Sequence, residues 1–206
     1  MPVAIEAMEA GKDVMVDKPG CVTLQQLQAI REVQARTGRI WTVNFSERFE
    51  VASMAKADEL VFGGAIGRVV QTLGLGPHRQ NLATRPPWFF ERSRFGGIIC
   101  DIGSHQIDQF LWLIGSTEAE ISHALVENST MPDHPEFQDY AEFVLPSERA
   151  HGFVRIDWFT ADGLPTWGRR ASVHTGNGRV HRTSEIYRYR ARACHRHAVP
   201  GERGEQ

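Results

Sequence analysis

The run Asp13-Val14-Met15-Val16-Asp17-Lys18-Pro19-Gly20 carries the strongest fold signal of the chain. Its first five residues form a brief apolar run, which is typical of a buried strand in a parallel sheet. Lys18-Pro19-Gly20 then predicts a turn, because proline cannot donate to a sheet ladder and glycine favours sharp bends. We therefore expect a short strand whose carboxyl end carries a lysine.

The segments on both sides of this strand favour helices. Residues 2–10 predict a short helix. Thr23 followed by Gln26 matches a capping box and predicts a second helix, which ends at Gly38. Residues 40–45 predict a second strand. This alternation favours an α/β arrangement with a right-handed crossover between parallel strands.

The pattern changes after about residue 46, where strands follow one another without intervening helices. Such a succession favours an antiparallel or mixed sheet, so the fold class we expect is α/β then α+β. A long irregular segment inside a compact domain is more often functional than a plain connector. The elements expected here are a helix over 51–62, a strand over 68–75, a long loop over 76–97, a helix over 104–114 and strands over 119–128, 138–145 and 151–160.

The composition is that of an ordinary globular protein. The chain has 206 residues, 41% of them hydrophobic, and no uncharged apolar run long enough to span a membrane. Acidic residues interrupt the apolar N-terminus, so we expect no signal peptide, and three scattered cysteines fit a reducing compartment. The net charge of −2 disfavours nucleic-acid binding. We therefore expect a cytoplasmic protein without membrane or nucleic-acid partners.

Residues 169–206 differ in composition from the rest of the chain. They hold nine arginines and three acidic residues, and they lack Lys, Leu, Phe, Trp and Asp. One hypothesis is a frame-shifted reading of GC-rich coding DNA; the other is a genuine basic, disordered arm. Translation of the other two frames beyond codon 168 would decide between them.

Lys18 is the first candidate for chemistry, because open α/β sheets bind ligands at the carboxyl ends of their strands. A lysine there can donate to a substrate oxygen, and a cis bond before Pro19 would fix its direction. The alternative is an ordinary surface lysine in a turn.

The second candidate is the run Gly96-Gly97-Ile98-Ile99-Cys100-Asp101-Ile102-Gly103-Ser104-His105 and the helix that follows. Helical periodicity places Ile107, Phe110, Leu111 and Ile114 on one face, and His105, Asp108, Gln109 and Trp112 on the opposite face. An aspartate four residues before a histidine can orient the imidazole for general-base catalysis. The alternative is a solvated polar face.

One other interpretation uses the same residues. Asp101, His105 and Asp108 could ligate a metal as a facial set, although no partner motif accompanies them. No G-x-G-x-x-G phosphate-binding loop occurs anywhere in the chain.

Taken in order, these motifs resemble the glucose–fructose oxidoreductase / inositol dehydrogenase / rhizopine-catabolism (Gfo/Idh/MocA) oxidoreductases. The resemblance spans about residues 2–168. The matching stretches are Lys12–Pro19, Val43–Phe45 through Arg48-Phe49, Gly64–Gly67, Gly96–His105 and Leu113–Gly115.

The resemblance implies an NAD- or NADP-dependent oxidoreductase that acts on sugar- or cyclitol-type alcohols by hydride transfer. By the same resemblance, His105 takes the hydroxyl proton, Lys18 binds the reacting oxygen and Asp101 orients the imidazole. It also implies a homo-oligomer, a dimer or tetramer formed through the sheet. The implied cofactor contacts are Asp17, Lys18, Pro19 and Asn44, and the implied substrate contacts are Lys18, Arg85, Asp101 and His105, with Arg79 as a weaker candidate.

Family members carry a Gly-rich loop and several βα units before the Lys-Pro turn, whereas one helix and one strand precede Lys18 here. We therefore expect an N-terminally truncated chain. Its expected parts are the C-terminal remnant of a Rossmann domain (1–46), an incomplete substrate and oligomerisation domain with a mostly antiparallel sheet (47–168), and an atypical Arg-rich tail (169–206). Such a chain would be inactive alone; the alternative is a non-catalytic remnant or a dimerising scaffold of the same fold.

Overall fold

The structure is a computed structural model that describes residues 1–160, 170–175 and 180–184. Across those residues, no helix combines the length and the apolar character needed to cross a bilayer. Two strands form one sheet and six strands form another. Each sheet has its own cluster of buried hydrophobic residues.

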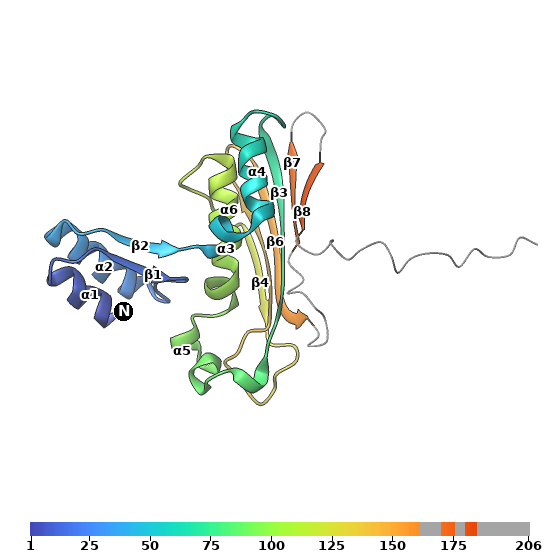
Figure 1. The fold of residues 1–206 in the computed structure, drawn as a ribbon. Helices are drawn as coiled ribbons and strands as arrows, with labels where there is room; N and C mark the ends of the chain where they lie inside the picture. Colours follow the sequence, from blue (N-terminus) through green and yellow to red (C-terminus); the bar gives the residue numbers. More distant parts are fainter. Residues whose placement is uncertain (161–169, 176–179, 185–206) are drawn as a thin grey trace, which may run out of the picture.

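The N-terminal part pairs β1 (Val14–Asp17) with β2 (Trp41–Asn44) in parallel, as the alternation predicts. Two helices, α1 (Pro2–Glu9) and α2 (Leu24–Thr37), accompany this pair (Figure 1). The Thr23 hydroxyl accepts from the backbone N–H of Gln26 at 3.1 Å, which confirms the expected N-cap of α2.

The larger sheet has the strand order β4-β5-β6-β3-β7-β8. Among the strands that the structure describes, β3 and β6 pair in parallel and the other pairings in this sheet are antiparallel. The expected mostly antiparallel sheet after an α/β part is therefore confirmed. Its strands are β3 (Val69–Arg79), β4 (His123–Glu127), β5 (Tyr140–Pro146), β6 (His151–Thr160), β7 (Arg170–Thr175) and β8 (Val180–Ser184).

Helices lie on one side of this sheet, with α4 and α6 running along it (Figure 1). Short 3₁₀ turns and one π-helical turn, η3, complete the connections. The elements are α3 (Ser46–Glu50), α4 (Ala52–Phe62), η1 (Leu82–Thr84), η2 (Pro87–Phe90), α5 (Arg92–Phe95), η3 (Ile99–Gly103) and α6 (Ser104–Ile114).

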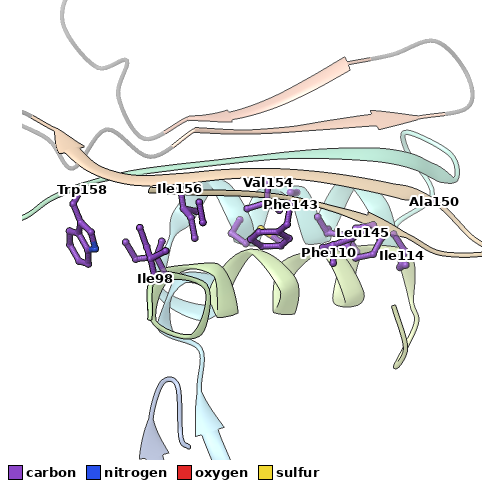
Figure 2. Close-up of a cluster of buried hydrophobic side chains, with 14 of the residues drawn as sticks. Ile98, Phe110, Ile114, Phe143, Leu145, Ala150, Val154, Ile156 and Trp158 are labelled. Carbon is purple, nitrogen blue, oxygen red and sulfur yellow. The ribbon is translucent and has the colours of Figure 1, made fainter. Parts of the chain in front are cut away.

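The main core lies between α6 and the sheet. Figure 2 shows Phe110 of α6 among side chains that descend from the strands, including Phe143 and Val154. All three are at most 1% exposed. A side chain at Gly74 would overlap the Gln106 side chain, so glycine on β3 is what lets α6 approach the sheet.

Two expectations need correction. The strand predicted over 68–75 continues to Arg79, and the loop predicted over 76–97 contains η1, η2 and α5. The face of α6 with His105, Asp108, Gln109 and Trp112 is only partly solvated: His105 is buried, whereas Trp112 donates to Asp58 of α4 at 3.0 Å and stays 43% exposed. Helical periodicity predicted that these residues share one face of α6, but it could not show which elements pack against that face.

Part of the arginine-rich segment belongs to the sheet. β7 lies within it and pairs with β3 from Val69 to Leu75, and β8 pairs with β7. The remaining residues of the segment, and with them most of what the frame-shift hypothesis concerns, lie outside the described residues.

Candidate active site

Lys18 and Asp101 meet between the two parts of the chain. The Lys18 ammonium contacts Asp101 Oδ1, joining the turn after β1 to the π-helical turn η3. The two side chains are 23% and 14% exposed, so the pair is largely shielded from water. The Lys18–Pro19 bond is cis, as anticipated from the X-Pro sequence. The contact brings together the two candidates that the sequence singled out separately.

The backbone around Asp101 has an unusual local form. Gly96 and Gly97 adopt φ values of +81° and +88°, which favour glycine, and the chain then enters η3 before α6 begins. The Ser104 hydroxyl donates to the Asp101 carbonyl at 3.1 Å. Single π-helical turns within helices are frequent at functional sites, because they redirect a side chain. Here Asp101 lies in that turn, and Lys18 is its ion-pair partner.

His105 lies one turn beyond Asp101 and is 4% exposed. Its Nε2 is 3.8 Å from Glu47 Oε1, and its ring meets Phe45 edge-on with the centroids 6.0 Å apart. The structure therefore places the predicted base in the same region as Lys18 and Asp101, but in a more enclosed environment than a solvated helix face.

Asp108 continues the same side of α6. Arg48 Nε of α3 donates to Asp108 Oδ2 at 2.7 Å, and the Arg48 guanidinium also stacks over Trp112 at 4.5 Å. Burial raises the pKa of Asp108, and the hydrogen bond and charge of Arg48 counteract part of that rise. This pair fixes α3 against α6 and so holds Glu47 beside His105.

Arg85 lies on the loop beyond β3. Its guanidinium stacks over Phe89 at 4.2 Å and Trp158 at 5.0 Å, and its Nε donates to the Gln80 carbonyl at 2.8 Å. Burial lowers the pKa of Arg85, while the charge of Asp101 opposes that shift. The weaker candidate, Arg79, is the last residue of β3.

The implied cofactor contacts share one edge of the small sheet. Asp17 and Asn44 are register partners at the carboxyl ends of β1 and β2, and Lys18 and Pro19 follow directly. The Lys18 backbone N–H donates to Asp17 Oδ1 at 2.9 Å. This edge is where an open parallel sheet binds ligands.

The metal hypothesis finds no support in this geometry. Asp101 and Asp108 each face a cationic side chain, Lys18 and Arg48, which competes with a metal ion for the same oxygens. In the part of the chain that the structure describes, no group of three His, Cys, Asp or Glu residues is arranged to hold a metal.

Two buried residues of the site were not predicted. Glu47 of α3 and His78 of β3 are 4% and 6% exposed, and Glu47 Oε1 is 3.6 Å from His78 Nε2. His78 carried no sequence signal, because it lies in a segment that was predicted to be a loop and is part of β3. Glu47 lay within a stretch matched to the family, but nothing in the sequence indicated its burial.

The parallel α/β unit, the Lys-Pro turn that contacts η3 and the large mixed sheet agree with the class of oxidoreductases that the motifs resemble. The chain belongs to the Gfo/Idh/MocA family of that class, because the model of the GFO/IDH/MocA C-terminal domain matches residues 54–181, more than half of its length. The resemblance drawn from the motifs is therefore confirmed.

Curated relatives carry dehydrogenase names. The chain is 31% identical over 126 residues to scyllo-inositol 2-dehydrogenase (NAD(+)) of Bacillus subtilis, covering 61% of this chain and 35% of that protein. It is 22% identical over 167 residues to scyllo-inositol 2-dehydrogenase (NADP(+)) IolW of the same organism, covering 81% of this chain and 44% of that protein. The chain thus spans less than half the length of these two relatives.

Solved structures share the fold. A protein of Erwinia carotovora atroseptica SCRI1043, named as an oxidoreductase, is 45% identical with a TM-score of 0.80, covering 84% of this chain and 52% of that one. Levoglucosan dehydrogenase in complex with NADH is 23% identical with a TM-score of 0.72, covering 84% of this chain and 48% of that one. The second likeness supports the fold alone.

Proposed function

We propose that this chain is the substrate-side portion of an NAD- or NADP-dependent oxidoreductase that oxidises CH–OH groups of sugar- or cyclitol-type alcohols. The observation that carries the proposal is the contact of Lys18 with Asp101, with His105 one helical turn further on. We further propose residues 1–46 as part of the dinucleotide-binding domain and residues 47–168 as the substrate domain.

Each of the three side chains has a distinct role in this proposal. Lys18 donates to the reacting oxygen and stabilises the negative charge that develops on it. Asp101 holds the Lys18 ammonium in place, and we propose that it also orients the His105 imidazole from the preceding turn. His105 takes the hydroxyl proton as the C–H hydrogen leaves as hydride and the alcohol becomes a carbonyl. The enclosure of His105 excludes competing water.

The carboxyl edge of the parallel strands supports one end of a cofactor site. We propose that Asp17, Lys18, Pro19 and Asn44 would contact the nicotinamide end of the cofactor there. When bound, NAD or NADP supplies the hydride acceptor. The sequence offers no G-x-G-x-x-G loop for the pyrophosphate, so we propose that this chain by itself binds the cofactor weakly and turns over little substrate.

Isothermal titration of NAD and NADP into the purified chain tests this part of the proposal. We expect no binding tighter than millimolar. Micromolar binding would show that the chain forms a phosphate site without the loop motif, and it would contradict both the weak-binding proposal and the non-catalytic alternative.

The alternative, a non-catalytic scaffold that dimerises through its sheet, is favoured by the sheet face opposite α6. Three apolar side chains, Leu73, Phe153 and Val144, are register neighbours on β3, β6 and β5 there, and all three are partly exposed. We propose that this row contacts a second copy of the chain. Light scattering of wild type and Phe153→Glu checks it: a monomer in both would contradict the proposal.

A further inference from the structure

Trp158 carries a buried donor near the carboxyl end of β6. The residue is 6% exposed, and within the residues that the structure describes its indole Nε1 has no hydrogen-bond acceptor. Figure 2 shows the ring beneath the sheet, on the side of α6 and beside Ile98. An indole N–H that leaves water normally finds an acceptor, because a buried donor without one costs free energy. This donor is therefore a candidate contact for a bound molecule.

Arg85 places a cation next to this donor. Its guanidinium carbon is 5.0 Å from the centroid of the Trp158 ring and 4.2 Å from that of Phe89, which is 4% exposed. Its Nε donates to the Gln80 carbonyl at 2.8 Å, so the stacking and this bond together fix the plane of the guanidinium. In the described part of the chain, the two terminal nitrogens have no hydrogen-bond acceptor. They form a planar fork that matches a carboxylate.

The carboxylates on the adjoining elements have cationic partners of their own. Asp101 of η3 pairs with Lys18, and Asp157 of β6 pairs with Arg155 at 3.0 Å. Over residues 1–160, 170–175 and 180–184, Arg85 itself forms no ion pair. Burial lowers the pKa of Arg85, because the charged guanidinium loses part of its solvation. An anion bound beside Arg85 would offset that cost.

The donor pair of Arg85 and Trp158 borders the residues proposed for catalysis. The Trp158 ring meets His78 edge-on, with the centroids 5.6 Å apart. Glu47 Oε1 is 3.6 Å from His78 Nε2 and 3.8 Å from His105 Nε2. These contacts form a continuous series from Arg85 to the proposed base. The donor pair is therefore part of the same site and not a separate surface.

We propose that Arg85 and Trp158 bind a carboxylate of the substrate, so that the substrates of the proposed site are polyhydroxy acids of the sugar-acid type. The terminal N–H groups of Arg85 and the indole N–H of Trp158 donate to the carboxylate oxygens. A carboxylate fits this subsite because both side chains only donate, whereas a hydroxyl group brings a hydrogen of its own and no charge. The assignment as substrate rests on the proposed function, but the binding of a carboxylate does not.

The test compares two sugars that differ only at C6, D-glucuronate and D-glucose, in titrations of the full chain followed by ¹H–¹⁵N NMR of the indole groups. The chain has five tryptophans, and Trp158→Phe assigns the Trp158 signal. We expect glucuronate to shift this signal and to bind about tenfold more tightly than glucose, because charge-assisted hydrogen bonds contribute more than neutral ones. Equal affinities, or a Trp158 signal that glucuronate does not shift, would overturn the proposal. This comparison needs no variant of Arg85.

Variants separate the subsite from the overall charge of the chain. Arg85→Gln removes the cation, so we expect glucuronate to bind about tenfold more weakly and glucose to bind as before. Trp158→Phe keeps a ring but loses the N–H, and we expect a loss of about threefold for glucuronate. Arg94→Gln is the matched control, because Arg94 also stacks over an aromatic ring, Trp88 at 5.7 Å, but its side chain is 58% exposed. An equal loss in Arg85→Gln and Arg94→Gln would refute the proposal.

These results also separate the subsite from the proposed function. If glucuronate binds at Trp158 while a form of the protein with a complete cofactor domain oxidises no sugar-type alcohol, the proposed function fails and the subsite stands. If such a form oxidises neutral sugars and glucuronate does not bind, only the subsite fails.

Discussion

Breaking the contact between Lys18 and Asp101 probes the junction on which the proposed site depends. The perturbation is a double-mutant cycle of Lys18→Met and Asp101→Asn, which isolates the pairwise energy from other effects of each change. The pair connects the turn after β1 to η3, and its side chains are 23% and 14% exposed. It thus lies between a surface ion pair and a fully buried one.

The expected magnitude follows from that intermediate burial. Exposed pairs contribute 0–1 kcal/mol, whereas removing one partner of a buried pair costs roughly 3–5 kcal/mol. We expect a coupling energy of about 2 kcal/mol for Lys18 and Asp101, and a fall in Tm of roughly 4–8 °C for Asp101→Asn. Urea and thermal unfolding followed by circular dichroism measure both quantities.

A matched control lies within the N-terminal part. Arg36 and Glu9 form an ion pair with side chains 60% and 46% exposed, so their cycle should give less than about 1 kcal/mol. If the Lys18 and Asp101 effects add to within about 0.5 kcal/mol, the contact does not join the two parts, and the site as described would be wrong.

Three further predictions concern other parts of the molecule. Gly97→Ala should lower the free energy of unfolding by roughly 3 kcal/mol, because φ is +88° and the new methyl group would overlap packed side chains. Gly11→Ala is the control: φ is +77° but the space is open, so it should lower the free energy of unfolding by only about 1 kcal/mol. Urea unfolding measures both values. Burial raises the pKa of Asp108 despite Arg48, so folding favours the protonated carboxyl group. The free energy of unfolding of wild type relative to Asp108→Asn should therefore decline as pH rises from below 3.8 through the raised pKa. Equal differences between the two proteins at pH 3.5 and pH 7 in urea unfolding would contradict this. In any form of the protein that turns over, His105→Ala should lower kcat by roughly 10²- to 10⁴-fold, and near-wild-type turnover would remove His105 from the mechanism.

Local signals predicted those elements of the fold whose causes are local. The Thr23 cap and the left-handed Gly38 bound α2 as expected, because both act within one turn of the helix. β3 was predicted too short because Gly76 and Pro77 resemble a loop. In the structure Gly74 and Gly76 leave room for the side chains of α6 and η3, and Pro77 pairs with Asp157 of β6.

The candidate site shows the same difference between local signals and tertiary packing. Asp101 and His105 were predictable as candidates because a spacing of four residues is typical of one helix side, and Lys18 because it follows a strand; their catalytic roles stay predictions. Glu47 and His78 were not, because only tertiary packing brings α3 and β3 to His105. That same packing replaces solvent on the polar side of α6 with a carboxyl group and a second imidazole. Because burial removes the water that would otherwise solvate the imidazole, the residues that the sequence did not indicate set the environment in which His105 would act as the proposed base.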